Sequence, residues 1–204
     1  MEKLNRDFYM RDSVTVAKDL LGNYLVHKVE GKEIIGKIVE VEAYMGPDDK
    51  AAHSYNNRRT ERNEVMYGLG GFSYVYFIYG MYHCMNVVVE KIGKPQAILI
   101  RALEPIFNIN TMAVNRYNKS IEELSKSEVK GLTNGPGKLC RALKIDRKEN
   151  AKDLCGDELY IMSDENIATF EMVSTTRVNI DYAEEAALYP WRFYIKNNPY
   201  ISKK

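Results

Sequence analysis

The spacing of apolar and polar residues predicts many strands and several helices, without a regular βαβ rhythm. Ser13–Leu21 has the periodicity of an amphipathic helix, with Ser13 at the capping position and Gly22 directly after the end. The expected apolar face of this helix consists of Val16, Ala17, Leu20 and Leu21. We therefore expect a helix here that buries one face.

Two pairs of strand-like segments follow, and a short turn joins each pair. The predicted hairpins are Tyr24–Val29 with Glu33–Tyr44 around Gly31-Lys32, and Ser73–Tyr79 with Tyr82–Val89 around Gly80-Met81. Side chains alternate along a strand, so Val39, Val41 and Ala43 share one face of the second strand. Its other face carries Glu40, Glu42 and Tyr44. One face is expected to pack, and the other to offer carboxylates beside an aromatic ring.

The remaining pattern completes an α+β fold. Gln96–Leu103 is mostly apolar, which predicts a central strand. Gly46–Gly71 is a long segment with one or two short helical turns, which is typical of a functional or a disordered loop. Further helices are expected at Ile109–Tyr117, at Ile121–Ser127 and from Thr133–Lys138 through Leu143, before short strands and the aromatic group Trp191–Tyr194. The expected architecture is one mixed domain, residues 1–204, with a curved antiparallel β-sheet, flanking helices and a protruding β-hairpin.

Composition is ordinary for a globular protein, with 28% charged and 45% hydrophobic residues. No apolar run approaches the roughly 18 residues of a membrane span, and Met1–Arg11 lacks the apolar core of a signal peptide. Cys84, Cys140 and Cys155 are widely spaced, which suggests neither a zinc site nor a disulfide framework. We therefore expect an intracellular protein.

A net charge of +1 does not by itself indicate a nucleic-acid partner. Arg58, Arg59 and Arg62 nevertheless form a local basic cluster that could contact phosphates. The alternative is a solvated loop.

A candidate for catalysis is Glu42 together with Arg101. Arg101 interrupts an apolar strand and shares a face with Leu99 and Leu103, so it needs a buried partner, for which Glu42 and Glu104 are candidates. The pair could be a structural ion pair. It could also be a site in which Arg101 orients Glu42 as a general base for water.

Tyrosines are concentrated on or beside the two hairpins, at Tyr44, Tyr74, Tyr76, Tyr79 and Tyr82. They could serve strand packing, or their rings could hold an unstacked base. Tyr79 stands beside the turn Gly80-Met81, where a core residue is not expected, so it could be a wedge between bases. His53 follows in the long loop and is either structural or part of a pocket wall.

Gly135-Pro136-Gly137-Lys138 opens a predicted helix. Free amides at a helix start and the charge of Lys138 could bind a phosphate. Proline in the first turn with nearby glycine is also ordinary capping sequence.

Two motifs in these regions resemble the alkyladenine (3-methyladenine) DNA glycosylases, also called methylpurine DNA glycosylases. They are EVEAYxGPxDxAxHS, ending at Ser54, and YVYxIYGMYxCMN, which spans Tyr74–Asn86. The resemblance covers nearly the whole chain. Other matching segments are Ala17–Gly22, Arg62-Asn63, Arg101–Pro105, Gly135–Cys140, Arg177-Val178 and Pro190–Tyr194.

The resemblance implies a monofunctional enzyme of base excision repair that flips a damaged purine out of double-stranded DNA and hydrolyses its N-glycosidic bond. It implies no metal, no cofactor and no lysine Schiff base. The implied substrates are 3-methyladenine, 7-methylguanine, hypoxanthine and ethenoadenine. It further implies a monomer, in the cytoplasm and associated with the nucleoid of a bacterium, without a membrane partner.

The resemblance also assigns roles to residues. Glu42 activates water that Arg101 and the carbonyl of Val178 help to place. The base pocket is formed by Tyr44, His53, Tyr76 and Asn86, of which Asn86 limits entry of guanine. The implied DNA contacts are Tyr79 as the intercalating side chain, flanked by Met81 and Tyr82. The basic residues Arg58, Arg59, Arg62 and Lys138 are candidate phosphate contacts from the residue pattern and not from the resemblance.

The chain departs from the family pattern at three positions. Asn179 replaces a glycine, Trp191 replaces a smaller aliphatic residue, and Glu61 replaces the proline before Arg62. Asparagine tolerates a left-handed backbone, so the turn at Asn179 is expected to survive.

Two alternatives to the monofunctional enzyme remain. One is a module that binds distorted DNA or RNA without cleavage, and the other is a bifunctional glycosylase with lyase activity.

Overall fold

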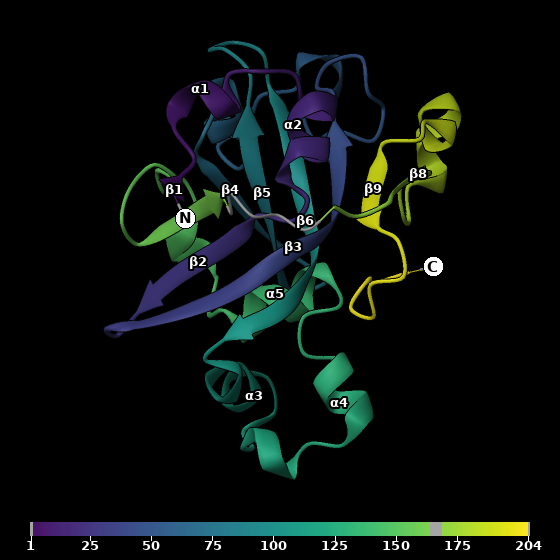
Figure 1. Ribbon diagram of the computed structural model, residues 1–204. Helices are drawn as coiled ribbons and strands as arrows, with labels where there is room; N and C mark the ends of the chain where they lie inside the picture. The colour runs from purple at the N-terminus through teal and green to yellow at the C-terminus, as the bar shows by residue number, and fades with distance from the viewer. Residues whose placement is uncertain (1, 164–168, 204) are drawn as a thin grey trace.

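One antiparallel sheet of nine strands forms the centre of the computed structural model, which describes residues 2–163 and 169–203 (Figure 1). Within these residues the strand order is β1-β7-β2-β3-β6-β5-β4, and β8 and β9 extend it beside β3. The strands are β1 (Glu2–Lys3), β2 (Tyr24–Val29), β3 (Lys32–Tyr44), β4 (Ser73–Ile78), β5 (Tyr82–Val89), β6 (Gln96–Phe107), β7 (Leu159–Ser163), β8 (Met172–Thr175) and β9 (Arg192–Ile195). The predicted α+β class and the central position of β6 are confirmed.

β3 is the longest strand and organises the sheet. Its first half pairs with β2, its last residues pair with β9 on the same edge, and β6 runs along the other edge. The register between β3 and β6 shifts on both sides of Glu40, because Glu40 lies opposite Ala102, one residue out of step with Ile38 opposite Leu103 and Val41 opposite Ile100. Such bulges bend a strand and redirect its side chains. Here they lie where β3 passes the candidate catalytic residues.

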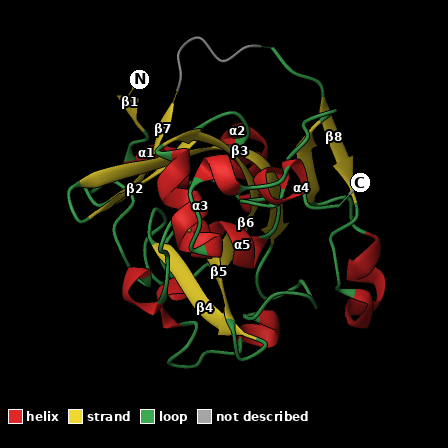
Figure 2. Cartoon of the chain, turned by 90° about the horizontal axis from the view of Figure 1, so that it is seen from below, coloured by secondary structure: helices red, strands yellow, loops and turns green. Residues whose placement is uncertain are grey.

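Helices cover the sheet (Figures 1 and 2). Of these, α2 packs on β3 and β6, α5 packs on β5 and β6, and α3 and α4 lie beyond the end of β6. Their bounds are α1 (Arg6–Tyr9), α2 (Ser13–Leu20), α3 (Ile109–Tyr117), α4 (Lys126–Lys130) and α5 (Pro136–Ala142). Short 3₁₀ segments occur at Tyr55–Asn57, Glu64–Tyr67, Ile121–Glu123, Arg147–Glu149 and Asp181–Leu188.

The amphipathic pattern of α2 is confirmed, because Val16, Ala17 and Leu20 have no exposed surface. Its predicted cap is wrong. Asp12 caps the helix by accepting the backbone N–H of Thr15, while the backbone N–H of Ser13 is bound by Gln96. Aspartate caps as well as serine, so sequence pattern could not separate the two neighbours.

Two other predicted boundaries differ from the structure. The first hairpin turns at Glu30-Gly31, both at positive φ, so that Lys32 already belongs to β3. Residues Ile121–Ser127 do not form one helix. Ser120 caps a 3₁₀ turn that ends at Glu123. The helix α4 starts only after a second cap at Ser125. The second serine interrupts the helix because its side chain competes with backbone hydrogen bonding.

Two expectations about cysteines and membranes can be compared with the structure. Cys84, Cys140 and Cys155 are all free thiols. In residues 2–163 and 169–203, no helix has the length and apolar character needed to cross a bilayer.

Candidate active site

A cavity of about 510 Å³ opens between β3, β4, β5 and β6 on one side and two later segments on the other. The later segments are Gly135–Lys138 and Val178–Tyr182. The structure brings most of the predicted pocket residues to this one place: Tyr44, His53, Tyr74, Tyr76, Tyr79, Tyr82, Asn86, Arg101, Lys138 and Val178 all line it. Residues separated by more than 130 positions in the sequence therefore share one cavity.

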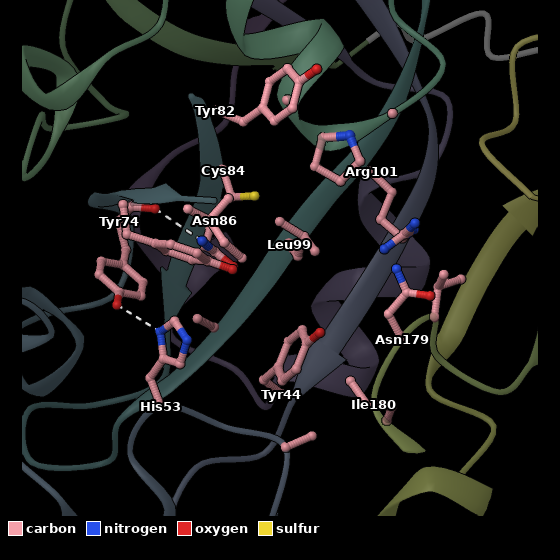
Figure 3. Close-up of a pocket in the computed structure, with 18 of the residues that line it drawn as sticks. Tyr44, His53, Tyr74, Tyr82, Cys84, Asn86, Leu99, Arg101, Asn179 and Ile180 are labelled. Atoms are coloured by element: carbon pink, nitrogen blue, oxygen red, sulfur yellow. Dashed lines mark hydrogen bonds between the residues drawn. The ribbon is translucent and has the colours of Figure 1, made fainter. Parts of the chain in front are cut away.

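One wall of the cavity is aromatic and polar (Figure 3). Nδ1 of His53 and the hydroxyl of Tyr74 share a hydrogen bond of 2.8 Å, and the side-chain amide of Asn86 donates to the Tyr74 carbonyl at 3.0 Å. The ring of Tyr76 lies 4.7 Å from that of His53 and 5.3 Å from that of Tyr74. These contacts fix the rings before any ligand enters.

His53 is neutral at pH 7. Desolvation in the wall of the cavity, together with the positive charges of Arg62 and Arg58, lowers the pKa of His53 to about 4. A neutral imidazole does not repel a cationic ligand, and it is not a proton donor of the imidazolium type at neutral pH.

The opposite wall contains Tyr44, Arg101, Asn179 and Ile180 (Figure 3). Asn179 adopts the left-handed conformation expected for it, with φ of 60°, and its side chain is exposed at the cavity. Burial raises the pKa of the Tyr44 hydroxyl well above its usual value, and neighbouring Glu42 and Tyr76 raise it further. Tyr44 is therefore a hydrogen-bond donor at physiological pH.

Glu42 lies directly behind this wall rather than in it. Its side chain has no exposed surface and does not line the cavity. The hydroxyl of Tyr44 donates to Oε2 at 3.0 Å and the backbone N–H of Val178 donates to Oε1 at 2.7 Å, while Arg101 Nη1 lies 3.3 Å from Oε1. The expectation that this strand face offers its carboxylate openly is wrong for Glu42, because the side chain is buried and is bound by three residues that do line the cavity.

Arg101 has two carboxylate partners, of which sequence analysis named one. Besides Glu42, its Nε binds Glu40 at 3.2 Å. Glu104 is not a partner, since it accepts instead from the side-chain amide of Asn198. The bulges of β3 and β6 around Glu40 explain the difference, because a regular strand register would not predict which carboxylate reaches Arg101.

A buried ion pair that sequence analysis missed holds Tyr44 and Val178 in place. Arg177 and Asp49 form a bidentate pair, and neither side chain has exposed surface. The guanidinium of Arg177 lies between two rings, 4.7 Å from the centre of Tyr44 and 5.1 Å from that of Trp191. The unusual Trp191 thus packs on this arginine. Only the fold brings residues 49 and 177 together, so sequence spacing held no signal for the pair.

The tip of the β4–β5 hairpin projects exposed apolar side chains. Strand β4 ends at Ile78, so Tyr79 belongs to the turn and not to the strand as predicted. Tyr79 has φ of 53° and is 76% exposed, and Met81 is 67% exposed. A bulky residue in the left-handed region is uncommon and costs stability, which favours a role outside packing. Tyr182 is a second exposed ring at the cavity, and no sequence motif indicated it.

The glycine-rich start of α5 has a packing role. A Cβ atom at Gly137 would lie 2.7–2.9 Å from side-chain atoms of Tyr82, so only glycine allows this close approach. Lys138 lines the cavity and donates to Asn134 Oδ1 at 2.8 Å. Gly137 therefore helps to hold Tyr82 beside the cavity.

The predicted basic cluster is exposed but not uniform. Arg59 pairs with Glu64, whereas the guanidinium of Arg62 lies over the ring of Tyr76 at 4.8 Å. Arg58 and Arg62 border a smaller hollow that adjoins His53 and Tyr74. Arg58 and Arg62 thus lie next to the cavity, and Arg59 is partly neutralised.

Comparison with known proteins shows the family of this chain. Residues 7–199 match the family model described as methylpurine-DNA glycosylase. The chain belongs to the methylpurine-DNA glycosylase family. It is therefore a DNA glycosylase, an enzyme that hydrolyses N-glycosyl bonds in DNA.

Several bacterial relatives cover the chain end to end. A protein of Alkaliphilus oremlandii is 58% identical over 202 residues, which is 99% of this chain and 100% of the relative. One of Desulfitobacterium hafniense is 55% identical over 204 residues, covering 100% of both chains. A third, from Bacillus cytotoxicus, is 58% identical over 96% of this chain and 97% of its own. Each is named as a candidate 3-methyladenine DNA glycosylase.

Among the residues that the structure describes, no group of three or more histidine, cysteine, aspartate or glutamate side chains is arranged to hold a metal ion.

Proposed function

We propose that this glycosylase removes alkylated purines from double-stranded DNA, above all 3-methyladenine and 7-methylguanine, and leaves an abasic site. The observation that carries the proposal is an aromatic cavity whose wall contains three groups bound to one buried carboxylate, Glu42. A base can lie between the rings of such a cavity while its glycosidic bond is near the carboxylate. The enzyme would act as a monomer in the bacterial cytoplasm.

The cavity suits a flipped purine that carries positive charge. Alkylation at N3 or N7 makes a purine cationic, and aromatic faces attract cations. Tyr44 and Tyr76 supply such faces, and the neutral His53 adds no repulsion. Asn86 is held by the Tyr74 carbonyl at the inner wall, where it would disfavour the exocyclic amine of guanine; in 7-methylguanine the positive charge, which attracts the aromatic faces and weakens the glycosidic bond, would offset this penalty. Neutral hypoxanthine and ethenoadenine would enter the same space.

Hydrolysis would proceed by attack of water on the sugar carbon C1′. The bond between C1′ and the base nitrogen breaks, its electron pair leaves with the base, and the sugar develops oxocarbenium character. Glu42 accepts a proton from the water and stabilises the positive sugar. Arg101 and the Val178 carbonyl would orient the water. Because Tyr44 and Val178 now cover the carboxylate, this step requires a small displacement of one of them when DNA binds.

Flipping requires that something occupy the vacated position in the base stack. Tyr79 stands 76% exposed at the hairpin tip, with Met81 and Tyr82 beside it. We propose that Tyr79 intercalates and that Met81 and Tyr82 contact the minor groove. Arg58, Arg62 and Lys138, with Arg59 farther out, would bind phosphates and position the duplex.

Replacing Tyr79 by serine should weaken binding of a lesion duplex by roughly 10- to 100-fold, because stacking of one base on an aromatic ring contributes about 1–3 kcal/mol. Fluorescence anisotropy with a duplex that contains a stable abasic analogue measures the change. Tyr55→Ser removes an exposed tyrosine of the long loop and serves as the matched control. Equal affinities of Tyr79→Ser and wild type would rule out the wedge.

The proposed function is tested by excision from duplexes that each carry one defined lesion. We expect release of the methylated purines and an intact strand until alkali is added. A protein that binds distorted nucleic acid without cleavage would release no base from any duplex. A bifunctional enzyme would be trapped on DNA by borohydride, which would contradict the monofunctional mechanism.

A further inference from the structure

A second carboxylate, Glu40, lies behind Glu42 on the same face of β3. Its side chain has no exposed surface and is not part of the cavity wall. Any effect of Glu40 on a bound nucleotide must therefore pass through its neighbours. Burying a charged group is costly unless it is paired and hydrogen-bonded. The groups that bind Glu40 therefore indicate its role.

Glu40 is surrounded by donors from three distant parts of the chain. Its Oε1 is bound by Arg192 Nη1 at 2.9 Å, by the hydroxyl of Ser202 at 2.9 Å and by Arg101 Nε at 3.2 Å. Its Oε2 accepts the backbone N–H of Ser202. Both oxygens are thus satisfied, and two arginines depend on one carboxylate.

Arg101 is held between two carboxylates. Its Nε faces Glu40, its Nη2 donates to the hydroxyl of Ser202 at 3.1 Å, and its Nη1 lies 3.3 Å from Glu42 Oε1. Burial alone would lower the pKa of Arg101, but Glu42 and Glu40 outweigh it and raise that pKa, so the guanidinium remains charged. With Nε and Nη2 occupied, Arg101 presents only Nη1 to Glu42.

The second arginine connects Glu40 to the segment that covers Glu42. Arg192 Nε donates to the carbonyl of Thr176 at 3.0 Å, two residues before Val178. The N–H of Val178 in turn donates to Glu42 Oε1 at 2.7 Å. Glu40 therefore anchors both groups that bind Glu42 Oε1.

We propose that Glu40, together with Ser202, is a positioning residue for base excision, which limits the contact of Arg101 with Glu42 and fixes the segment Thr176–Val178. The inference rests on the proposed role of Glu42. Without the negative charge of Glu40, Arg101 turns further toward Glu42 and pairs with it more strongly. A carboxylate paired in this way is a weaker base toward water.

The pH profile of excision separates this role from a structural one. Charged and titratable groups that face the two carboxylates are Tyr44 on β3, Cys84 on β5, Arg101 on β6, Arg192 on β9, and Arg177 and Tyr182 beside Val178. Glu40→Gln removes one negative charge from this set. The acidic limb of the profile, where the excision rate falls as the pH is lowered, should then move to lower pH by on the order of one pH unit.

The experiment compares single-turnover excision of a methylated purine by Glu40→Gln and wild type between pH 4.5 and 9, on the order of ten pH values. We expect a rate constant roughly 10- to 100-fold lower, the effect typical of removing a residue that orients a reactive group from behind. The Kd for a lesion duplex should stay near wild type. Glu104→Gln is the matched control, because this half-buried glutamate on β6 binds Asn198 and no arginine.

Ser202→Ala provides a second test that keeps the charge of Glu40. It keeps the proposal testable if Glu40→Gln does not fold. It removes the hydroxyl contacts to both Glu40 and Arg101, so the rate should fall several-fold and the acidic limb should shift in the same direction. The proposal would be overturned if either folded variant kept both the wild-type excision rate per active molecule and the wild-type position of the acidic limb. If Glu42→Gln retained full excision, the proposed function itself would fail, whatever the result for Glu40.

Discussion

Glu42→Gln should reduce single-turnover excision of a methylated purine by at least about 10³-fold, because general-base catalysis contributes on the order of 10²–10⁴ and the stabilising charge on the sugar is lost as well. Glutamine has nearly the same shape and keeps an oxygen for the N–H of Val178. Binding of a lesion duplex should therefore survive. Quenched-flow excision and anisotropy with the same duplex measure the two quantities separately.

The control for Glu42→Gln is Glu33→Gln, a change of the same type on the same strand. Glu33 is half exposed and pairs with Lys28, far from the cavity lining. Its excision rate should equal that of wild type. A Glu42→Gln enzyme that still excises at the wild-type rate would remove Glu42 from the mechanism.

Asp49→Ala should lower the free energy of unfolding by about 3–5 kcal/mol, because it leaves the guanidinium of Arg177 buried and without its counter-charge. Asp49 also accepts hydrogen bonds from the backbone N–H groups of Met45 and Ala51, and the substitution removes both bonds. Urea unfolding at pH 7, followed by far-UV circular dichroism, measures the change.

Glu64→Ala is the matched control, since it breaks an ion pair with Arg59 in which both side chains are more than half exposed. No measurable change in unfolding is expected for an exposed pair. If Asp49→Ala were as stable as Glu64→Ala, the pair would not hold the site together. In the folded fraction of Asp49→Ala, excision should also fall, because Arg177 no longer fixes Tyr44 and Val178.

Local pattern predicted most elements because their signals lie within a few residues. The apolar face of α2, the two hairpins and the helical turns in Gly46–Gly71 are set by side-chain periodicity and turn residues. Errors concerned the boundaries of elements, including the turn after β2 and the end of β4. Asp12 and Ser13 can both cap α2, and Ser125 interrupts a helix that periodicity alone would continue.

The membership of the cavity was also predictable to a large extent. Tyr74, Tyr76 and Asn86 alternate along one hairpin, so they must project from the same face once the hairpin forms. The burial of Glu42 was not predictable in this way. Whether a carboxylate on a strand face meets solvent depends on what covers that face, and Val178 arrives there from 136 residues away.

The sequence by itself determined the fold class, the family and the residue types of the site, because periodicity and two dense motifs are properties of neighbouring residues. Only the tertiary structure decided which carboxylate each arginine binds. It pairs Asp49 with Arg177 and places Glu40 behind Glu42. These pairings join segments up to 162 positions apart, as for Glu40 and Ser202. Their energies depend on distance and exclusion of water, which a linear pattern does not contain.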